Sequence, residues 1–443
     1  MPLARTAPTA PAVARTTARV RRRAVLPLLV CVLYAILQLA AGPQWTLFPD
    51  SYRYARAAEQ YLGASRQEAH RTALAAYCES RAERSAHDQR LQPLVRRSEH
   101  AIAETEEKAC LDRWADAPDI TTDDPRYQAI FSTRPGYPLL AAPFVGAFGV
   151  LGGMRVLGLI TAAAGSLLVF GLLRGAGLTG WAAAAGQVTF LATPLGWWSA
   201  QALGEGLFTV CTLGVLWGGL LLTRRRSVLA AAALTVFSYT AAAVTRYSSV
   251  LVLAALLAAA ALAALCFSSR LRHRGTAVFA GLSAAAAGGV VLAMRMLGLP
   301  SSRTTLQDTF THHFDGPEVS DPWSALLGLA GRFWRDWAAE QGAMPYFLLL
   351  TAVAAWALAA YGDGLGWLAL ATLLTGACLI TAHPLVQEAD RLGVLMWMPV
   401  VLGLPLIVDR HWATRPVREP EMPCVGASTG GRPELLLGRH KNQ

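Results

Sequence analysis

The sequence predicts an all-α, polytopic integral membrane protein with about ten transmembrane helices and a long first loop outside the membrane. The 443 residues are 54% hydrophobic and only 15% charged, whereas a soluble domain carries about 25% charged residues. Apolar runs of 17–22 residues recur along most of the chain, which is enough to cross a roughly 30 Å hydrocarbon core. The net charge of +10 is clustered beside these runs, a pattern that favours membrane lipids rather than nucleic acid as the partner.

The first apolar run, residues 24–41, follows Arg21, Arg22 and Arg23. Residues 1–23 are rich in Ala, Thr, Pro and Arg and are expected to be a disordered, cytoplasmic N-terminus. A cleaved signal peptide is the alternative, because the stretch ending at Ala41 resembles a cleavage site. The length of the apolar run and the spans that follow favour an uncleaved first helix.

Residues 43–135 form a long polar loop in which 66–91 and 94–116 read as two charged helices. A helical hairpin that turns at Pro93 would bring Cys78 opposite Cys110. A disulfide is plausible in an extracytoplasmic loop and would contribute about 3–4 kcal/mol in the chain-entropy model. Two unpaired thiols are the alternative.

The stretch 137–153 is apolar but contains two prolines and several glycines. These residues suit a segment that lies in or dips into the membrane better than one that crosses it. If it does not cross, the basic clusters at 224–226 and 270–274 fall on the same side as Arg410, as the positive-inside bias favours. The chain then has ten full spans in the cell (plasma) membrane, or eleven if 137–153 crosses. Both termini are then cytoplasmic.

The membrane domain is predicted to cover residues 24–409, with a second extracytoplasmic loop at 299–343 and a disordered cytoplasmic tail at 410–443. The predicted spans are 24–41, 155–173, 181–198, 203–222, 228–244, 248–267, 277–297, 345–361, 365–382 and 393–408.

This topology places ionisable residues from distant parts of the chain at one membrane face. Ionisable groups at membrane depth are costly and tend to mark function. The residues concerned are Asp50, Arg134, Glu205, Arg246, His383, Glu388, Asp390 and Arg391.

Asp50 follows the first span and precedes a helical stretch at 51–62. It could cap that helix, since Asp is preferred at the N-cap. It could also act as a general base that takes a proton from a hydroxyl group at the membrane surface. The two roles can coexist.

Three further residues have one structural and one functional interpretation each. Glu205 could be a solvated helix-end carboxylate, although its flanking glycines would let another group approach closely. Arg246 could be an interfacial anchor. Arg391 could bind a phosphate through its planar guanidinium group, or pair with Glu388 or Asp390.

A metal site is not predicted. His312 and His313 lie near Asp315, but adjacent histidines in a loop point apart and the spacing specifies no third ligand.

Five short motifs in order resemble the GT-C class of membrane glycosyltransferases, which includes mannosyltransferases and aminoarabinose transferases of the cell envelope. The resemblance runs from about residue 25 to 409. The motifs are Asp50-Ser51 with Tyr54, Arg134-Pro135-Gly136-Tyr137-Pro138-Leu139, Leu203-Gly204-Glu205-Gly206-Leu207-Phe208, Thr245-Arg246-Tyr247-Ser248, and Asp390-Arg391-Leu392 with Pro399.

The resemblance implies an inverting single displacement at the extracytoplasmic face. Asp50 would be the base for an acceptor hydroxyl group, and a polyprenyl phosphate would be the leaving group. Arg391, with Arg246 or Arg134, would stabilise the developing phosphate charge.

The remaining implications concern the substrates. Tyr54 and Tyr137 would bind substrate, Glu205 would orient the sugar or a basic partner, and 137–153 would line the groove for the lipid tail. The acceptor is a lipid, a glycan or a protein. Some members of the class use a divalent metal, but no cofactor is required by this sequence.

Two other function classes stay open. A transporter or flippase for a lipid or glycan explains the spans, but it predicts two similar halves, and no internal repeat is visible in the sequence. A non-catalytic membrane scaffold is favoured by departures from the motifs, such as Gly206 where the class usually has Pro and Leu392 where it has Tyr.

Overall fold

The computed structural model describes residues 11–40, 45–90, 92, 94, 97–225, 227–362 and 364–413, without the side chains of 11–24, 387 and 412–413. Within these residues every regular element is helical and no strand occurs. This agrees with the predicted all-α class. The predicted turn residue Pro93 and the tail residues 414–443 lie outside the described part of the chain.

Among the described residues, six helical segments are long and apolar enough to cross a membrane. They are α6 (Gly136–Gly175), α9 (Gly204–Thr223), α10 (Val228–Phe267), α11 (Arg274–Met296), α15 (Leu365–Ala382) and Val394–His411. A seventh is obtained if α13 (Pro322–Ala343) and α14 (Tyr346–Tyr361), which bend by 87°, count as one span. These helices are consistent with a polytopic membrane protein, whereas the predicted number of about ten spans stays a prediction.

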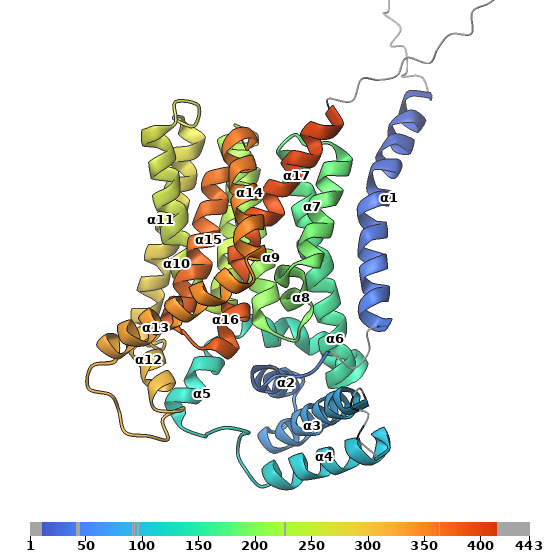
Figure 1. Cartoon of the computed structure of the whole chain (residues 1–443), viewed down its shortest axis with the longest axis vertical. Helices are drawn as coiled ribbons and strands as arrows, with labels where there is room; N and C mark the ends of the chain where they lie inside the picture. Colours follow the sequence, from blue (N-terminus) through green and yellow to red (C-terminus); the bar gives the residue numbers. More distant parts are fainter. Residues whose placement is uncertain are drawn as a thin grey trace, which may run out of the picture.

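Helix α10 is broken at Arg246, whose backbone angles (φ −153°, ψ 71°) are not helical. Arg224, before α10, and Arg270, after it, line one cavity, while Arg246 contacts Glu205 at the opposite end of α9. The chain therefore doubles back at Arg246 (Figure 1). This is the division between 228–244 and 248–267 that the sequence predicts.

Helix α6 is broken at Gly149, which has a φ of +70° that favours glycine. A Cβ atom on Gly153 would lie 2.5 Å from the carbonyl group of Phe144. Residues nine positions apart in a straight helix would be about 13 Å apart, so the chain folds back sharply here. The segment before the break packs near α2 (Pro49–Tyr61), as the contact between Gly146 and Leu62 shows.

Two predicted boundaries need correction. Helix α1 (Pro11–Ala40) begins inside the N-terminal segment predicted to be disordered, because Pro is well suited to a first helical position and Ala and Arg favour helix. The predicted span 181–198 is interrupted at Thr193, between α7 (Gly180–Ala192) and α8 (Pro194–Ala200). Pro194 disfavours helical geometry at the residue before it, and Thr193 is extended (φ −97°, ψ 169°).

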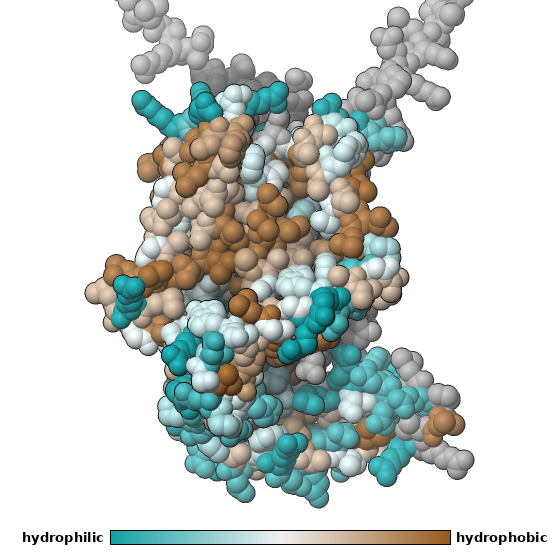
Figure 2. All heavy atoms as spheres, turned by 60° about the vertical axis from the view of Figure 1, so that its left-hand side comes forward, coloured by the Kyte–Doolittle hydropathy of each residue, from teal (hydrophilic) through white to brown (hydrophobic). Residues whose placement is uncertain are grey.

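Helices from the first loop, from the second loop and from the segment before the last apolar helix gather at one end of the bundle, which we call the loop end (Figure 1). They are α2, α3 (Arg66–Arg90), α4 (Glu99–Trp114), α5 (Pro125–Ser132), α12 (Ser302–Phe310) and α16 (Val386–Leu392). The opposite end, which we call the Arg224 end, carries the start of α1 and the end of α17 (Met398–Ala413). Figure 2 shows apolar residues covering the bundle between two hydrophilic ends.

Small residues bring the central helices together. A Cβ atom on Gly214 would lie 2.3 Å from Ser238 Oγ, and one on Gly218 would lie 2.2 Å from Thr235 Oγ1. Glycine thus lets α9 and the first half of α10 pack closely, as small residues do between membrane helices. This packing positions Glu205 and Arg246 at the loop end.

Candidate functional site

Asp50 lies in the first turn of α2 and does not cap it, which corrects one of the two predicted roles. Phe48 is the N-cap residue, Pro49 is the first helical residue, and Phe48 N donates to Ser51 Oγ. Proline is preferred at this first position because its missing N–H would have no partner there. The Asp50 carboxylate is therefore available for a contact outside its own helix.

That contact is with Arg391 of α16. Arg391 Nη1 donates to Asp50 Oδ2 over 2.8 Å. Arg391 Nε lies 3.1 Å from Glu205 Oε1, and Arg391 Nη2 lies 2.5 Å from Glu388 Oε2. One guanidinium group thus joins three carboxylates, two of them far away in the sequence.

Glu205 lies in the first turn of α9 and is buried, with 5% of its side chain exposed. Its Oε1 atom is 2.5 Å from Arg246 Nη1, at the break in α10. A Cβ atom on the following Gly206 would lie 2.7 Å from Ser199 Cα. Glycine at 206 therefore allows the close backbone approach that the sequence suggested for this motif.

Burial and ion pairing act in opposite directions on the pKa values of the two carboxylates outside the helical spans, Asp50 and Glu388. Burial raises the pKa of Asp50, but the positive charges of Arg391 and Arg53 outweigh burial and hold that pKa below its ordinary value of 3.8. Burial raises the pKa of Glu388 although Arg391 opposes the shift. The neighbouring arginines therefore keep Asp50 ionised at neutral pH, as a general base must be.

The Arg134–Tyr137 motif lies against the break in α10. A Cβ atom on Gly136 would be 2.8 Å from Thr245 Oγ1, so glycine permits this approach. The rings of Tyr137 and Tyr54 have centroids 5.0 Å apart. Burial raises the pKa of Tyr54 to about 12, which keeps its hydroxyl group neutral.

Arg134 is the predicted charged site residue that lies outside the ion-pair cluster. It is close enough to Tyr54 for its charge to lower the pKa of that phenol. Among the described residues it forms no ion pair with Asp50, Glu205 or Glu388.

A buried clamp, which the sequence analysis missed, fixes α2 against the first loop. Arg53 Nη2 lies 3.0 Å from Asp119 Oδ1 and Arg56 Nη1 lies 2.9 Å from Asp119 Oδ2. The Asp119 side chain is fully buried. The only sequence signal was the position of Arg53, one helical turn after Asp50. The clamp orients the helix face that carries Asp50.

The first loop is also cross-linked. The structure joins Cys78 of α3 to Cys110 of α4 by a disulfide, with Cα atoms 5.6 Å apart. Cys78 is fully buried against α2, in a cluster with Tyr52 and Ala55. The disulfide therefore lies in the same packed unit as the helix that carries Asp50.

The second loop reaches the site through α12. Thr309 Oγ1 lies 2.9 Å from His383 Nδ1, at the end of α15. Burial lowers the pKa of His383, with smaller electrostatic effects from Asp308, Arg391 and Asp50. His313 Nδ1 lies 3.0 Å from Asp308 Oδ1. No group of three or more metal-binding side chains occurs in the described part of the chain.

An apolar cavity of about 530 Å³ opens beside the Arg134 motif. It lies between the two halves of α10 and α11, and it reaches Thr133, Pro135 and Tyr247. None of its lining residues comes from 137–153, which the resemblance had implicated in a lipid groove.

Comparisons with known proteins place this arrangement in no family. No protein-family model, no curated protein and no solved structure matches the chain.

Proposed function

We propose that the protein is a GT-C-type glycosyltransferase that moves a sugar from a polyprenyl-phosphate donor to an acceptor hydroxyl group at the loop end. The observation that carries the proposal is the cluster of Asp50, Glu205, Arg246 and Arg391. These residues come from four of the five motifs quoted above, and the fold brings them within 2.5–3.1 Å of one another in successive pairs.

The chemistry assigned to the cluster is a single displacement. Asp50 accepts the proton of the acceptor hydroxyl group while the oxygen of that hydroxyl group attacks the anomeric carbon of the donor sugar. The bond between that carbon and the phosphate oxygen breaks, and polyprenyl phosphate leaves. The new bond forms on the opposite face of the sugar, so the anomeric configuration inverts.

Arg391 is assigned to the phosphate. Its planar group donates bidentate hydrogen bonds to phosphate and remains charged. In the structure the carboxylates of Asp50, Glu205 and Glu388 surround it. A donor phosphate would replace some of these contacts and would leave Asp50 free to accept a proton.

The cavity between α10 and α11 suits the lipid tail. Its lining is almost entirely apolar, and its residues Pro135 and Tyr247 are the sequence neighbours of Arg134 and Arg246. A chain bound there would place the attached phosphate near two arginines. In this proposal the tail lies against α10 and α11 rather than against 137–153.

A panel of radiolabelled polyprenyl-phosphate sugars, assayed in membranes, tests the proposal. We expect transfer with at least one donor, inversion at the anomeric carbon, and loss of transfer in R391Q with partial retention in R391K. The control R335Q removes an exposed arginine of α13 and should retain transfer. Transfer by R391Q at the wild-type rate would contradict the assignment of Arg391 to the phosphate.

The rival function is a lipid or glycan transporter. Secondary transporters use interrupted spans near the binding site, whereas α6 and α10 fold back at Gly149 and Arg246 into separate segments. Movement of a labelled lipid-linked sugar across proteoliposomes, without formation of any transfer product, would support this rival.

A further inference from the structure

We propose that the acceptor in the transfer reaction is a carbohydrate, and that one of its sugar rings binds in a cavity between α1, α8 and α16. This inference rests on the proposed function, because it names the class of molecule whose hydroxyl group Asp50 would deprotonate. The cavity has a volume of about 330 Å³, within the range of about 300–1,000 Å³ for small-molecule sites. It is formed at the break between α7 and α8, because Thr193 and Pro194 both line it.

The cavity lies beside the start of α2. Its residue Trp198 contacts Phe48, with ring centroids 5.7 Å apart, and Phe48 is the N-cap residue of the helix that carries Asp50. Asp390 also lines the cavity, and the next residue, Arg391, donates to Asp50 Oδ2 over 2.8 Å. Two walls of the cavity are therefore connected to the residue assigned as the general base.

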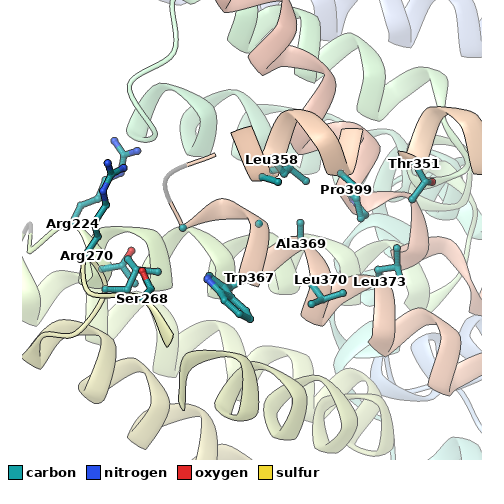
Figure 3. A pocket seen from close by; sticks show the side chains of 16 residues that line it. Arg224, Ser268, Arg270, Thr351, Leu358, Trp367, Ala369, Leu370, Leu373 and Pro399 are labelled. Carbon is teal, nitrogen blue, oxygen red and sulfur yellow. The ribbon is translucent and has the colours of Figure 1, made fainter. Parts of the chain in front are cut away.

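The donor has a separate place. The apolar cavity between α10 and α11, assigned above to the lipid tail, shares no described lining residue with this one. It meets the charged cluster beside Arg246, whose neighbour Tyr247 lines it, whereas the present cavity meets the cluster beside Arg391. A larger cavity of about 910 Å³, lined by Trp367, lies at the Arg224 end of the bundle (Figure 3) and is remote from Asp50.

The lining combines two aromatic residues with groups that pair with hydroxyl groups. Trp197 and Trp198 supply ring faces on which the C–H face of a sugar can pack, and each indole N–H is a hydrogen-bond donor. Asp390 supplies an acceptor, and the Gln38 amide supplies both donors and an acceptor. A pyranose ring carries apolar C–H faces and hydroxyl groups in one small body, so it uses both kinds of lining.

Hydrogen bonds within the protein hold the walls in place. The Tyr34 hydroxyl group of α1 donates to Gly196 O of α8 over 3.1 Å, and Thr193 Oγ1 donates to Phe190 O over 2.9 Å. Both hydroxyl oxygens keep lone pairs that can accept from a ligand. The lining is thus largely preformed, as small-molecule sites usually are.

Other ligand classes use this lining less completely. An acyl chain would leave Asp390 and Gln38 desolvated without partners, which is costly. A phosphate group would meet the negative charge of Asp390, so the cavity does not suit the donor phosphate. A quaternary ammonium group would pair with Asp390 but has no hydrogen-bonding group for Gln38, and a serine or threonine side chain is too small to cover two indole rings.

Binding of simple glycosides to the purified full chain in lipid nanodiscs, measured by saturation-transfer NMR without donor, tests the inference. The probes are the methyl glycosides of mannose, glucose, galactose, arabinose and N-acetylglucosamine, with their disaccharides. We expect saturable binding of at least one glycoside. W197A should weaken that binding about tenfold, and W197F should retain most of it. The control W367A, which removes a tryptophan from the cavity at the Arg224 end, should leave it unchanged.

A second variant tests the cavity without removing an aromatic residue. Ala192 lines the cavity at the end of α7 and is exposed, so a larger side chain can be placed there. A192W should abolish glycoside binding while its thermal midpoint stays near that of the wild type. Glycoside binding at wild-type strength in A192W would show that the sugar does not enter the cavity.

Transfer kinetics separate this inference from the proposed function. With a donor that the wild type uses, W197A should raise KM for the glycan acceptor about tenfold, while kcat and KM for the donor change by less than about twofold. Transfer with the same acceptor KM in W197A and the wild type would overturn the acceptor site and leave the transferase. Glycoside binding that W197A weakens, with no transfer from any donor, would contradict the proposed function and leave the binding site.

Three binding results would overturn the assignment to a carbohydrate. The first is no saturable binding of any glycoside in the panel. The second is an equal loss of binding in W197A and W367A, which would place the sugar elsewhere. The third is binding of choline or of an acetylated threonine tripeptide, blocked by A192W and tighter than that of every glycoside, which would assign the cavity to that ligand instead.

Discussion

The contact between Asp50 and Arg391 makes a quantitative prediction, because it joins residues 341 positions apart at 2.8 Å. The perturbation is a double-mutant cycle with D50N, R391Q and the double variant. Asn and Gln keep similar side-chain shapes and remove the charges. Since Asp50 does not cap α2, D50N leaves the start of that helix intact.

The expected coupling follows from burial. The side chains of Asp50 and Arg391 are 23% and 15% exposed, between a surface pair and a fully buried one. Exposed pairs contribute about 0.2–1 kcal/mol, and removing one partner of a buried pair costs about 3–5 kcal/mol. Arg391 also keeps two other carboxylates in D50N. We therefore expect a coupling free energy of about 1–2 kcal/mol, and a larger loss for R391Q, which leaves three carboxylates together.

The assay is reversible unfolding of the purified protein in mixed micelles, with the free energy of unfolding measured for all four proteins. The control cycle uses Arg84 and Asp88, an exposed pair on α3, for which we expect at most about 0.5 kcal/mol. Additive losses in D50N and R391Q, within about 0.5 kcal/mol, would refute the contact.

Three other predictions concern the disulfide, the close packing and the pH dependence. The free energy of unfolding of the variant C78S/C110S should be about 3–4 kcal/mol lower than that of the wild type, and reductant should have no further effect on the variant's thermal midpoint. A variant with the thermal midpoint of the wild type would contradict the cross-link. G206A should lose about 1–3 kcal/mol because its Cβ would meet backbone at 2.7 Å, whereas G281A, which has open space, should not; equal stabilities would be inconsistent with this packing. Folding lowers the pKa of Asp50. Its contribution to the free energy of unfolding is therefore present above pH 3.8 and is lost as the pH falls through the lower, folded-state pKa. If the wild type lost stability at about pH 5–6 and D50N did not, that result would argue against the ion pair.

The sequence predicted the helical class well because hydropathy reports the length of each apolar run directly. It also separated the two halves of α10, since Arg246 interrupts an otherwise apolar stretch. The break at Thr193 was missed although Pro194 was visible. A proline in an apolar run can kink a helix or end it, and the choice depends on packing against neighbouring helices.

The sequence predicted most of the residues that form the candidate site, but not which of them form ion pairs with one another. Spacing along the chain carries no information on which guanidinium group meets which carboxylate when the partners lie on different helices. Glu388 was considered as one of two partners for Arg391, and only the fold selects it over Asp390. The Asp119 clamp and the cavity at the Arg224 end depend on loop conformation, which hydrophobic periodicity does not report.

The most direct test of the central claim is the single-turnover rate of sugar transfer by D50N, measured with a donor that the wild type uses. Asp336→Asn is the matched control, because it neutralises an exposed carboxylate of α13. If Asp50 is the general base, D50N should be slower by about 10²–10⁴-fold while D336N stays near the wild-type rate. A D50N rate within a few-fold of wild type, in a folded protein, would contradict the account.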